Sequence, residues 1–129
     1  MQGRLTEEFR ARTKEFAART IRLYVKLPRD REHVRVCGRQ MLRAGTSVAA
    51  HIREASRARS DAEFISKVGG AIQEADESAL WLELLREECG IAPTDTLPLE
   101  KEADELIAIS TTMINRTRDG KKQKVENGK

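Results

Sequence analysis

Basic side chains that recur at helical spacing are the residues of this sequence most able to carry out chemistry. Two groups of four follow two stretches of the chain, and each group keeps one direction over several helical turns. The groups are Arg12, Arg19, Arg22 and Lys26, then Arg35, Arg39, Arg53 and Arg57. Arginine binds phosphates and carboxylates alike through paired hydrogen bonds. The eight residues are therefore candidates for binding the nucleic-acid backbone, and pairing with carboxylates is the alternative.

Histidine and cysteine occur without the further ligands that a metal site or a catalytic pair would need. His33 and Cys37 lie four residues apart, but no other His or Cys cluster completes a site with them. His51-x-x-Glu54 reverses the Glu-x-x-His order of di-metal bundles and occurs once. We therefore interpret His33 as a polar residue at a helix start beside a buried thiol, His51 as packed or interfacial, and Glu54 as a salt-bridge partner.

Aromatic residues are too few to favour stacking on nucleic-acid bases. Trp81 is the only tryptophan and Tyr24 the only tyrosine, and we expect both to pack against the bundle or a subunit interface. No glycine-rich phosphate loop, Ser/His/Asp set or isolated carboxylate pair occurs. The sequence therefore predicts a protein that is not an enzyme, with no cofactor, no metal and no small-molecule substrate.

Charge is divided unevenly along the 129 residues. Residues 1–59 carry 15 Lys/Arg against 6 Asp/Glu, a net charge of +9, whereas residues 60–118 carry 5 against 13, a net charge of −8. The last eleven residues carry a net charge of +2. Either the two halves neutralise each other within the fold or an oligomer, or the basic half faces a polyanion.

Composition favours one all-α domain in the cytoplasm. Hydrophobic residues make up 39% of the chain, charged residues 35% and aromatics 4%, which suits a thin helical bundle better than a β-sandwich. No apolar run approaches the roughly 20 residues that span a bilayer, and the N-terminus lacks the apolar segment of a signal peptide. We expect no membrane partner, and we expect Cys37 and Cys89 to be reduced thiols in apolar surroundings.

Apolar residues at alternating spacings of three and four predict four amphipathic helices. We expect these helices at residues 6–27, 30–57, 60–90 and 98–118. Short connections between them predict an antiparallel up-down-up-down four-helix bundle. The predicted domain covers residues 1–118, and residues 119–129 are predicted to be a disordered polar tail.

Residues that favour helix ends set these boundaries. Thr6 and Asp30 are the expected N-caps of the first two helices. The third begins with a capping box, Ser60-x-x-Glu63, and stops at Gly90. A loop is expected at residues 91–97, with Pro93 inside it and Pro98 directly after it, and the fourth helix is expected to begin at about Pro98.

Small residues in the second helix predict close contact with another helix. Gly45 lies in the run from Ala44 to Ala50, although glycine costs up to about 1 kcal/mol relative to alanine inside a helix. A backbone packed closely against this run explains why glycine is tolerated there. Extra apolar surface on the second and fourth helices further predicts association with other copies of the chain.

Several short blocks of the sequence resemble the bacterial four helix bundle proteins. In chain order they are QMLRAGTSV at 40–48, IxEA at 52–55, SxxEFIxK at 60–67, EAxExxxWL at 74–82 and EADEL at 102–106. That family includes proteins encoded by intervening sequences in large-subunit ribosomal RNA genes, and the accessory variability determinant of diversity-generating retroelements. The resemblance extends over most of the domain, from about Phe9 to Arg118.

The resemblance implies assembly into a barrel-like homopentamer around a central pore. For the retroelement members it also implies a basic surface that binds nucleic acid, and a reverse transcriptase as partner. The family commonly has Asn where this chain has His51, so no role of that amide is carried over.

Two functions are compatible with these features. The first is a non-enzymatic oligomeric accessory protein that binds the RNA or DNA backbone through its arginine-rich helices and assists a reverse transcriptase. The second is a structural scaffold whose arginines pair with the acidic half of the chain within the oligomer.

Overall fold

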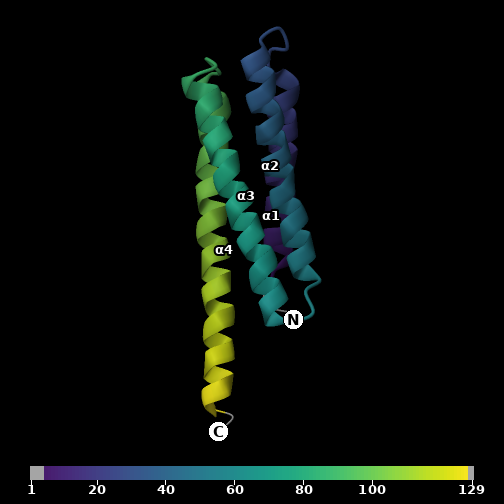
Figure 1. Ribbon diagram of the computed structural model, residues 1–129, viewed down its shortest axis with the longest axis vertical. Coiled ribbons are helices and arrows are strands. Elements are labelled where there is room, and N and C mark those ends of the chain that lie inside the picture. Colours follow the sequence, from purple (N-terminus) through teal and green to yellow (C-terminus); the bar gives the residue numbers. More distant parts are fainter. Residues whose placement is uncertain (1–4, 128–129) are drawn as a thin grey trace.

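The protein is an antiparallel four-helix bundle. The computed structural model describes residues 5–127, with side chains described as far as residue 120. The helices are α1 (Glu7–Lys26), α2 (Glu32–Ser56), α3 (Asp61–Glu87) and α4 (Pro93–Asn127), and the described residues contain no strand. The α1–α2 and α3–α4 connections lie at one end of the bundle (Figure 1). The predicted all-α, up-down-up-down bundle is confirmed.

Helix starts follow the capping residues in two of the predicted cases. The Thr6 hydroxyl accepts a hydrogen bond from the Phe9 backbone N–H at 3.0 Å, and the Ser60 hydroxyl accepts one from Glu63 N–H at 3.0 Å. The prediction of Asp30 as the N-cap of α2 is wrong. Arg31 is the N-cap, because its carbonyl accepts the first helical hydrogen bond, from Arg35 N–H at 3.2 Å.

Gly90 ends the α3 region as the sequence predicts. Its φ of +72° lies in the left-handed region that favours glycine. The N–H of Ile91 donates to the carbonyl of Leu85, six residues earlier in the chain, at 3.0 Å. The chain therefore reverses tightly into α4.

The predicted start and end of the fourth helix are wrong. Residues 93–97 are helical rather than a loop, because Pro93 occupies the first helical position, where its fixed φ suits a helix and its missing N–H costs nothing. Pro98 then lies inside α4, where it has no N–H to donate to the carbonyl of Thr94. At the other end the helix runs to Asn127, past the predicted end at Arg118.

The C-terminal turns of α4 project beyond the other helices (Figure 1). Their helical backbone covers most of the segment for which the sequence predicts a disordered tail. Residues 128–129 of that segment lie outside the described residues. The division into a domain of residues 1–118 and a separate tail stays a prediction.

One apolar core runs through the bundle. Every helix contributes to it, and its largest fully buried side chains include Phe16, Met41, Phe64, Leu82 and Leu106. The core also holds hydroxyl groups that bond to carbonyls of their own helix, such as Thr20 to Ala17 at 2.7 Å and Ser78 to Glu74 at 2.8 Å. These polar groups are therefore buried without losing their hydrogen bonds.

Close packing of α1 against α2 explains Gly45. A Cβ atom at this position would lie 2.5 Å from Cγ2 of Thr20 on α1. The predicted close helix contact therefore exists within one protomer. Among the helix pairs in contact, α2 with α3 and α3 with α4 make the most extensive contacts, and α1 with α4 makes the least extensive. Within the described part of the chain, no helix is both long and apolar enough to span a membrane.

Candidate nucleic-acid interface

Arg12 on α1 is bound to two carboxylates of α4. Its Nε and Nη2 donate to the two carboxylate oxygens of Glu102 at 2.7 and 2.8 Å, and Nη2 also donates to Glu105 at 2.9 Å. Hydrogen bonding from Arg12 lowers the pKa of Glu102, and the same bonds raise the pKa of Arg12. This arginine fastens α1 to α4 and is engaged within the protomer.

The other three predicted residues of α1 line a small cleft against the start of α4. The cleft has a volume of about 240 Å³ and is formed by Arg19, Arg22, Lys26 and residues of the first turns of α4. Lys26 contacts Asp95 at 3.3 Å, and Arg22 contacts Glu15 of its own helix at 2.6 Å. Arg19 has no hydrogen bond or ion pair with the described side chains, although its charge helps lower the pKa of Glu102.

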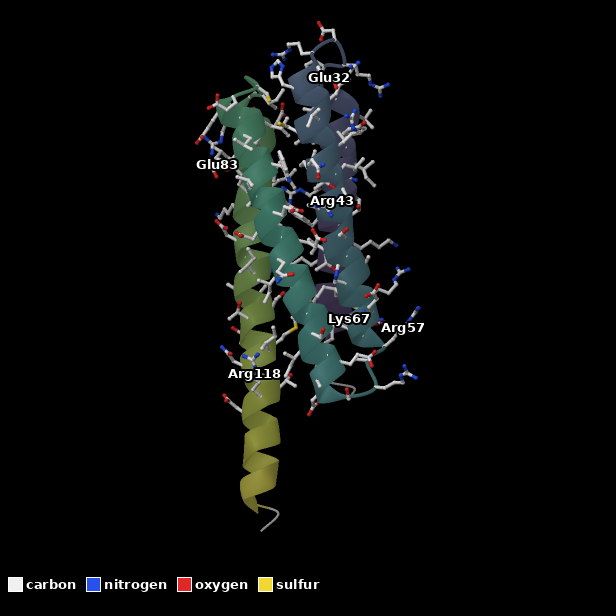
Figure 2. The ribbon with its side chains drawn as sticks, viewed as in Figure 1. Glu32, Arg43, Arg57, Lys67, Glu83 and Arg118 are labelled. Atoms are coloured by element: carbon white, nitrogen blue, oxygen red, sulfur yellow. The ribbon has the colours of Figure 1, made fainter. Side chains whose placement is uncertain are left out.

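The four predicted residues of α2 lie near its two ends. At the start of the helix, Arg35 pairs with Glu32 and donates to the carbonyl of Arg29 at 3.2 Å. Its hydrogen bond lowers the pKa of Glu32. Arg39, and near the other end Arg53 and Arg57, have no hydrogen bond or ion pair within residues 5–120. Arg57 extends away from the bundle into solvent (Figure 2).

Arg53 and Arg57 line a large open groove, here called the basic groove. It has a volume of about 1170 Å³ and lies where the start of α1, the end of α2 and the start of α3 converge. Its lining includes the small side chains of Ala11, Ala49 and Ala50. Because these side chains are short, the charged side chains around them rise above the groove surface.

The charges in the basic groove do not cancel. Its lining includes the cations Arg10, Lys14, Arg53, Arg57 and Lys67 and the carboxylates Glu7, Glu54 and Glu63. Two cations are neutralised, since Arg10 contacts Glu7 at 3.2 Å and Lys67 contacts Glu54 at 3.0 Å. Lys14, Arg53 and Arg57 remain without a carboxylate partner among the described side chains, beside the single carboxylate of Glu63. The groove therefore keeps a net positive charge.

The eight predicted residues thus divide among three places. Those of α1 face α4, Arg35 and Arg39 lie near the start of α2, and Arg53 and Arg57 lie in the basic groove. Sequence reasoning missed Lys14 and Arg10, which lie on a different side of α1 from Arg12. Their four-residue spacing indicates that they share one face of α1. Only the packing of α1 beside α2 places that face in the same groove as Arg53.

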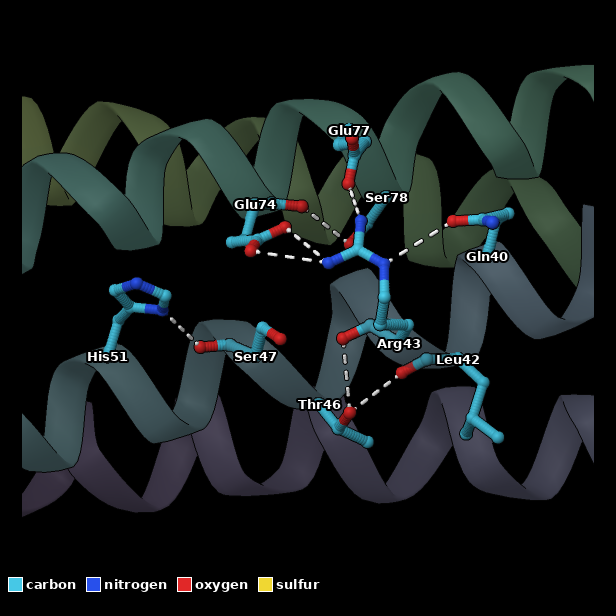
Figure 3. A network of polar contacts seen from close by, with 9 residues as sticks. All are labelled: Gln40, Leu42, Arg43, Thr46, Ser47, His51, Glu74, Glu77 and Ser78. Carbon is cyan, nitrogen blue, oxygen red and sulfur yellow. Dashed lines mark hydrogen bonds and ion pairs between the residues drawn. The ribbon is translucent and has the colours of Figure 1, made fainter.

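Arg43 is a further arginine that sequence reasoning did not single out. From α2 it reaches α3, where it contacts Glu74 at 3.5 Å and pairs with Glu77, and it also donates to the side chain of Gln40 at 3.3 Å (Figure 3). Between α3 and α4, Arg86 donates to both carboxylate oxygens of Glu100, at 3.0 and 2.9 Å. That pairing lowers the pKa of Glu100.

His51 packs inside the bundle and Glu54 is a salt-bridge partner, as the sequence predicts. His51 Nδ1 lies 2.9 Å from the carbonyl of Ser47 (Figure 3), and its ring packs against Gly70, where a Cβ atom would collide with it. Glu54 bonds to Lys67, and this bond lowers the pKa of Glu54. No group of three or more His, Cys, Asp or Glu side chains that could hold a metal occurs in the described part of the chain.

The aromatic side chains form no exposed stacking surface. Trp81 is half-buried against the core, with an indole N–H that is buried and has no hydrogen-bond partner among the described residues. Tyr24 is also half-buried and packs close to Gly38 of α2. Any contact with nucleic acid on this molecule would therefore be made mainly to phosphates.

Comparisons with known proteins agree with this fold. Residues 8–112 match the family model of the 23S rRNA-intervening sequence proteins. The chain is also similar to the crystal structure of a protein of unknown function from the S23 ribosomal protein family of Bacteroides thetaiotaomicron. That similarity has a TM-score of 0.76 and 34% sequence identity, and it covers 83% of this chain and 95% of the other. A search of curated proteins finds no match.

Proposed function

We propose that this chain, which belongs to the family of 23S rRNA-intervening sequence proteins, is a non-enzymatic protein that binds the phosphate backbone of RNA or DNA. One observation carries the proposal: Lys14, Arg53 and Arg57 line an open groove without carboxylate partners among the described side chains. Arginines whose hydrogen-bond donors are unused can bind phosphate at no cost to an existing ion pair.

This groove is suited to contacts with the phosphate backbone of a nucleic acid rather than with its bases. Its unpaired cations come from α1 and α2, and no aromatic side chain lines it. Such a surface recognises the regular negative charge of a nucleic-acid strand and carries little sequence information. Binding is therefore expected to be largely independent of sequence. A reverse transcriptase partner rests on the family resemblance alone.

Substitution of the groove arginines tests the proposal. Arg53→Gln together with Arg57→Gln should weaken binding of structured RNA about tenfold, because two charged hydrogen-bonding contacts are lost. Fluorescence anisotropy at low salt measures the affinity, and circular dichroism checks that the helices persist.

Arg116→Gln with Arg118→Gln is the matched control, since it removes the same charge from exposed positions of α4 outside the groove. The control should bind almost as tightly as the unaltered protein. Equal losses in both double variants would mean that binding depends on net charge only, and no binding by the unaltered protein would refute the proposal outright.

An oligomeric scaffold is the second candidate function. It is favoured by Arg12 and Arg43, since both belong to the basic half and both already bind carboxylates of the acidic half. Exposed apolar side chains occur on both halves and would be covered by contact between copies. They are Ile21, Val25, Val36, Leu80 and Leu97.

Assembly as a homopentamer, which the resemblance implies, is part of both candidate functions. Light scattering of the purified chain should give five times the mass of one chain. Val25→Asp, at an exposed position of α1, should lower that mass if α1 contacts a neighbouring copy. A monomeric mass for the unaltered protein would exclude both the pentamer and the scaffold.

A further inference from the structure

Two cysteines that are distant in the sequence meet at the end of the bundle where the helices are connected. Cys37 lies near the start of α2, and Cys89 follows the last turn of α3. Both thiols pack against the same apolar core, and they lie close enough for Cys37 to influence the pKa of Cys89. These are the only cysteines of the chain. The fold therefore brings together both of the thiols that the sequence contains.

The surrounding backbone holds the two thiols in place. Arg31, just before α2, donates a hydrogen bond from Nη1 to the carbonyl oxygen of Cys89 at 3.1 Å. The left-handed Gly90 and the hydrogen bond from Ile91 to Leu85 fix the turn that follows Cys89. Cys89 belongs to the apolar core, and Cys37 packs against the same core. The start of α2 is thus anchored against the end of α3.

The two thiols differ in their access to solvent. Cys37 is half-buried, whereas Cys89 is only 2% exposed. Burial raises the pKa of the Cys89 thiol, and the neighbouring Cys37 raises it further. Because the thiolate is the reactive form, the more accessible Cys37 is the thiol that meets a small oxidant first.

We propose that Cys37 and Cys89 are a redox-active pair that forms a reversible intramolecular disulfide when a peroxide oxidises the protein. The Cys37 thiolate attacks one peroxide oxygen and breaks the O–O bond, which leaves a sulfenic acid and, after protonation, one water. The Cys89 thiol then loses its proton and its sulfur attacks the Cys37 sulfur, and the hydroxyl leaves as a second water. Two thiols are oxidised and one peroxide is reduced to two waters, and a dithiol reductant reverses the change.

The disulfide would tie α2 to the α3–α4 turn. The basic groove is lined by residues near the opposite end of α2, so oxidation would leave its cations in place. The redox pair and the proposed nucleic-acid groove can therefore be tested independently. A crosslink between distant parts of the chain restricts the unfolded state, so the oxidised protein should unfold at a higher temperature than the reduced one.

Thiol counting by intact mass tests the proposal on the full chain. The reduced protein, unfolded in the presence of N-ethylmaleimide, should take up two labels. After treatment with hydrogen peroxide the protein should take up none, should have lost the mass of two hydrogens, and should remain a single chain on a non-reducing gel. Trypsin should then release one linked pair of peptides, residues 36–39 joined to residues 87–101.

Cys37→Ser provides the control, because this half-buried position tolerates a small polar side chain better than the buried Cys89 does. The variant should gain no heat stability on peroxide treatment, whereas the unaltered protein should gain several degrees. Two labels taken up after oxidation, disulfides between separate chains, or sulfinic acid at Cys37 without a disulfide would each overturn the proposal.

Discussion

At the scale of single residues, most of the ion pairs between helices of the described chain are made by arginines. Arg12 joins α1 to α4, Arg43 joins α2 to α3, and Arg86 joins α3 to α4. A half-buried bidentate pair should contribute more to stability than an exposed pair within one helix. The Arg12–Glu102 pair is the clearest case, because Nε and Nη2 of the guanidinium each donate to a different carboxylate oxygen.

Glu102→Gln should lower the free energy of unfolding by about 1 kcal/mol at neutral pH, because Arg12 then loses its principal charged partner. The folded protein lowers the pKa of Glu102 below 4.5, its ordinary value. The carboxylate therefore contributes stability above that ordinary value and loses it as the pH falls through the lowered pKa. Urea unfolding across the acid range should show the difference between the two proteins disappearing at low pH. A difference that stayed constant with pH would contradict this account of Glu102.

Gly45→Ala tests the close contact of α1 with α2. The added Cβ would lie 2.5 Å from Thr20 Cγ2, and overpacking of this kind costs about 1–3 kcal/mol. Gly69→Ala is the control, since a Cβ there meets nothing within 4 Å and alanine should stabilise α3 by up to about 1 kcal/mol. Thermal unfolding should therefore move in opposite directions in the two variants. A stabilised Gly45→Ala protein would show that the helices are not packed this closely.

At the scale of the helices, apolar spacing was enough to predict α1, α2 and α3 but not the start of α4. The sequence predicts Pro98 as the first helical residue, because proline usually interrupts a helix. Pro93 occupies that position instead, and the buried Thr96 and Leu99 then share one face of the same helix. Burial of that face outweighs the local preference of Pro98, and the sequence pattern alone does not reveal such tertiary effects.

Pro98→Ala distinguishes the observed helix from the predicted loop. If Pro98 lies inside α4, alanine restores the hydrogen bond to the Thr94 carbonyl and raises the free energy of unfolding by about 1–3 kcal/mol. If α4 began at Pro98, the same change would remove a favourable first residue and lower the stability. Chemical denaturation followed by circular dichroism measures the sign of the change.

The sequence predicts part of the candidate site. It predicts which residues share a face of one helix, but not which residues of different helices come into contact. Helical periodicity predicted that Arg53 and Arg57 share a direction on α2, and they do line one groove. Which arginines meet carboxylates depends on which helices are neighbours, as shown by Arg12 and Glu102, which are 90 positions apart in the sequence. The basic groove itself arises only where the ends of three helices converge.

At the scale of the whole molecule, the positive charge of residues 1–59 is only partly neutralised by carboxylates of residues 60–118. Several cations of the basic half bind carboxylates of the acidic half, but Lys14, Arg53 and Arg57 do not do so among the described residues. Under the proposed function, these three cations bind phosphates. Removal of a phosphate contact flattens the dependence of log affinity on log salt by about 0.7–0.9 units.

The salt dependence of RNA binding tests whether Lys14, Arg53 and Arg57 bind phosphates. Anisotropy titrations over a range of salt concentrations should compare the unaltered protein with the triple variant Lys14→Gln, Arg53→Gln and Arg57→Gln. Loss of three phosphate contacts predicts weaker binding and a slope that is flatter by about 2–3 units. A triple variant that binds RNA with the same affinity and the same slope would contradict the account.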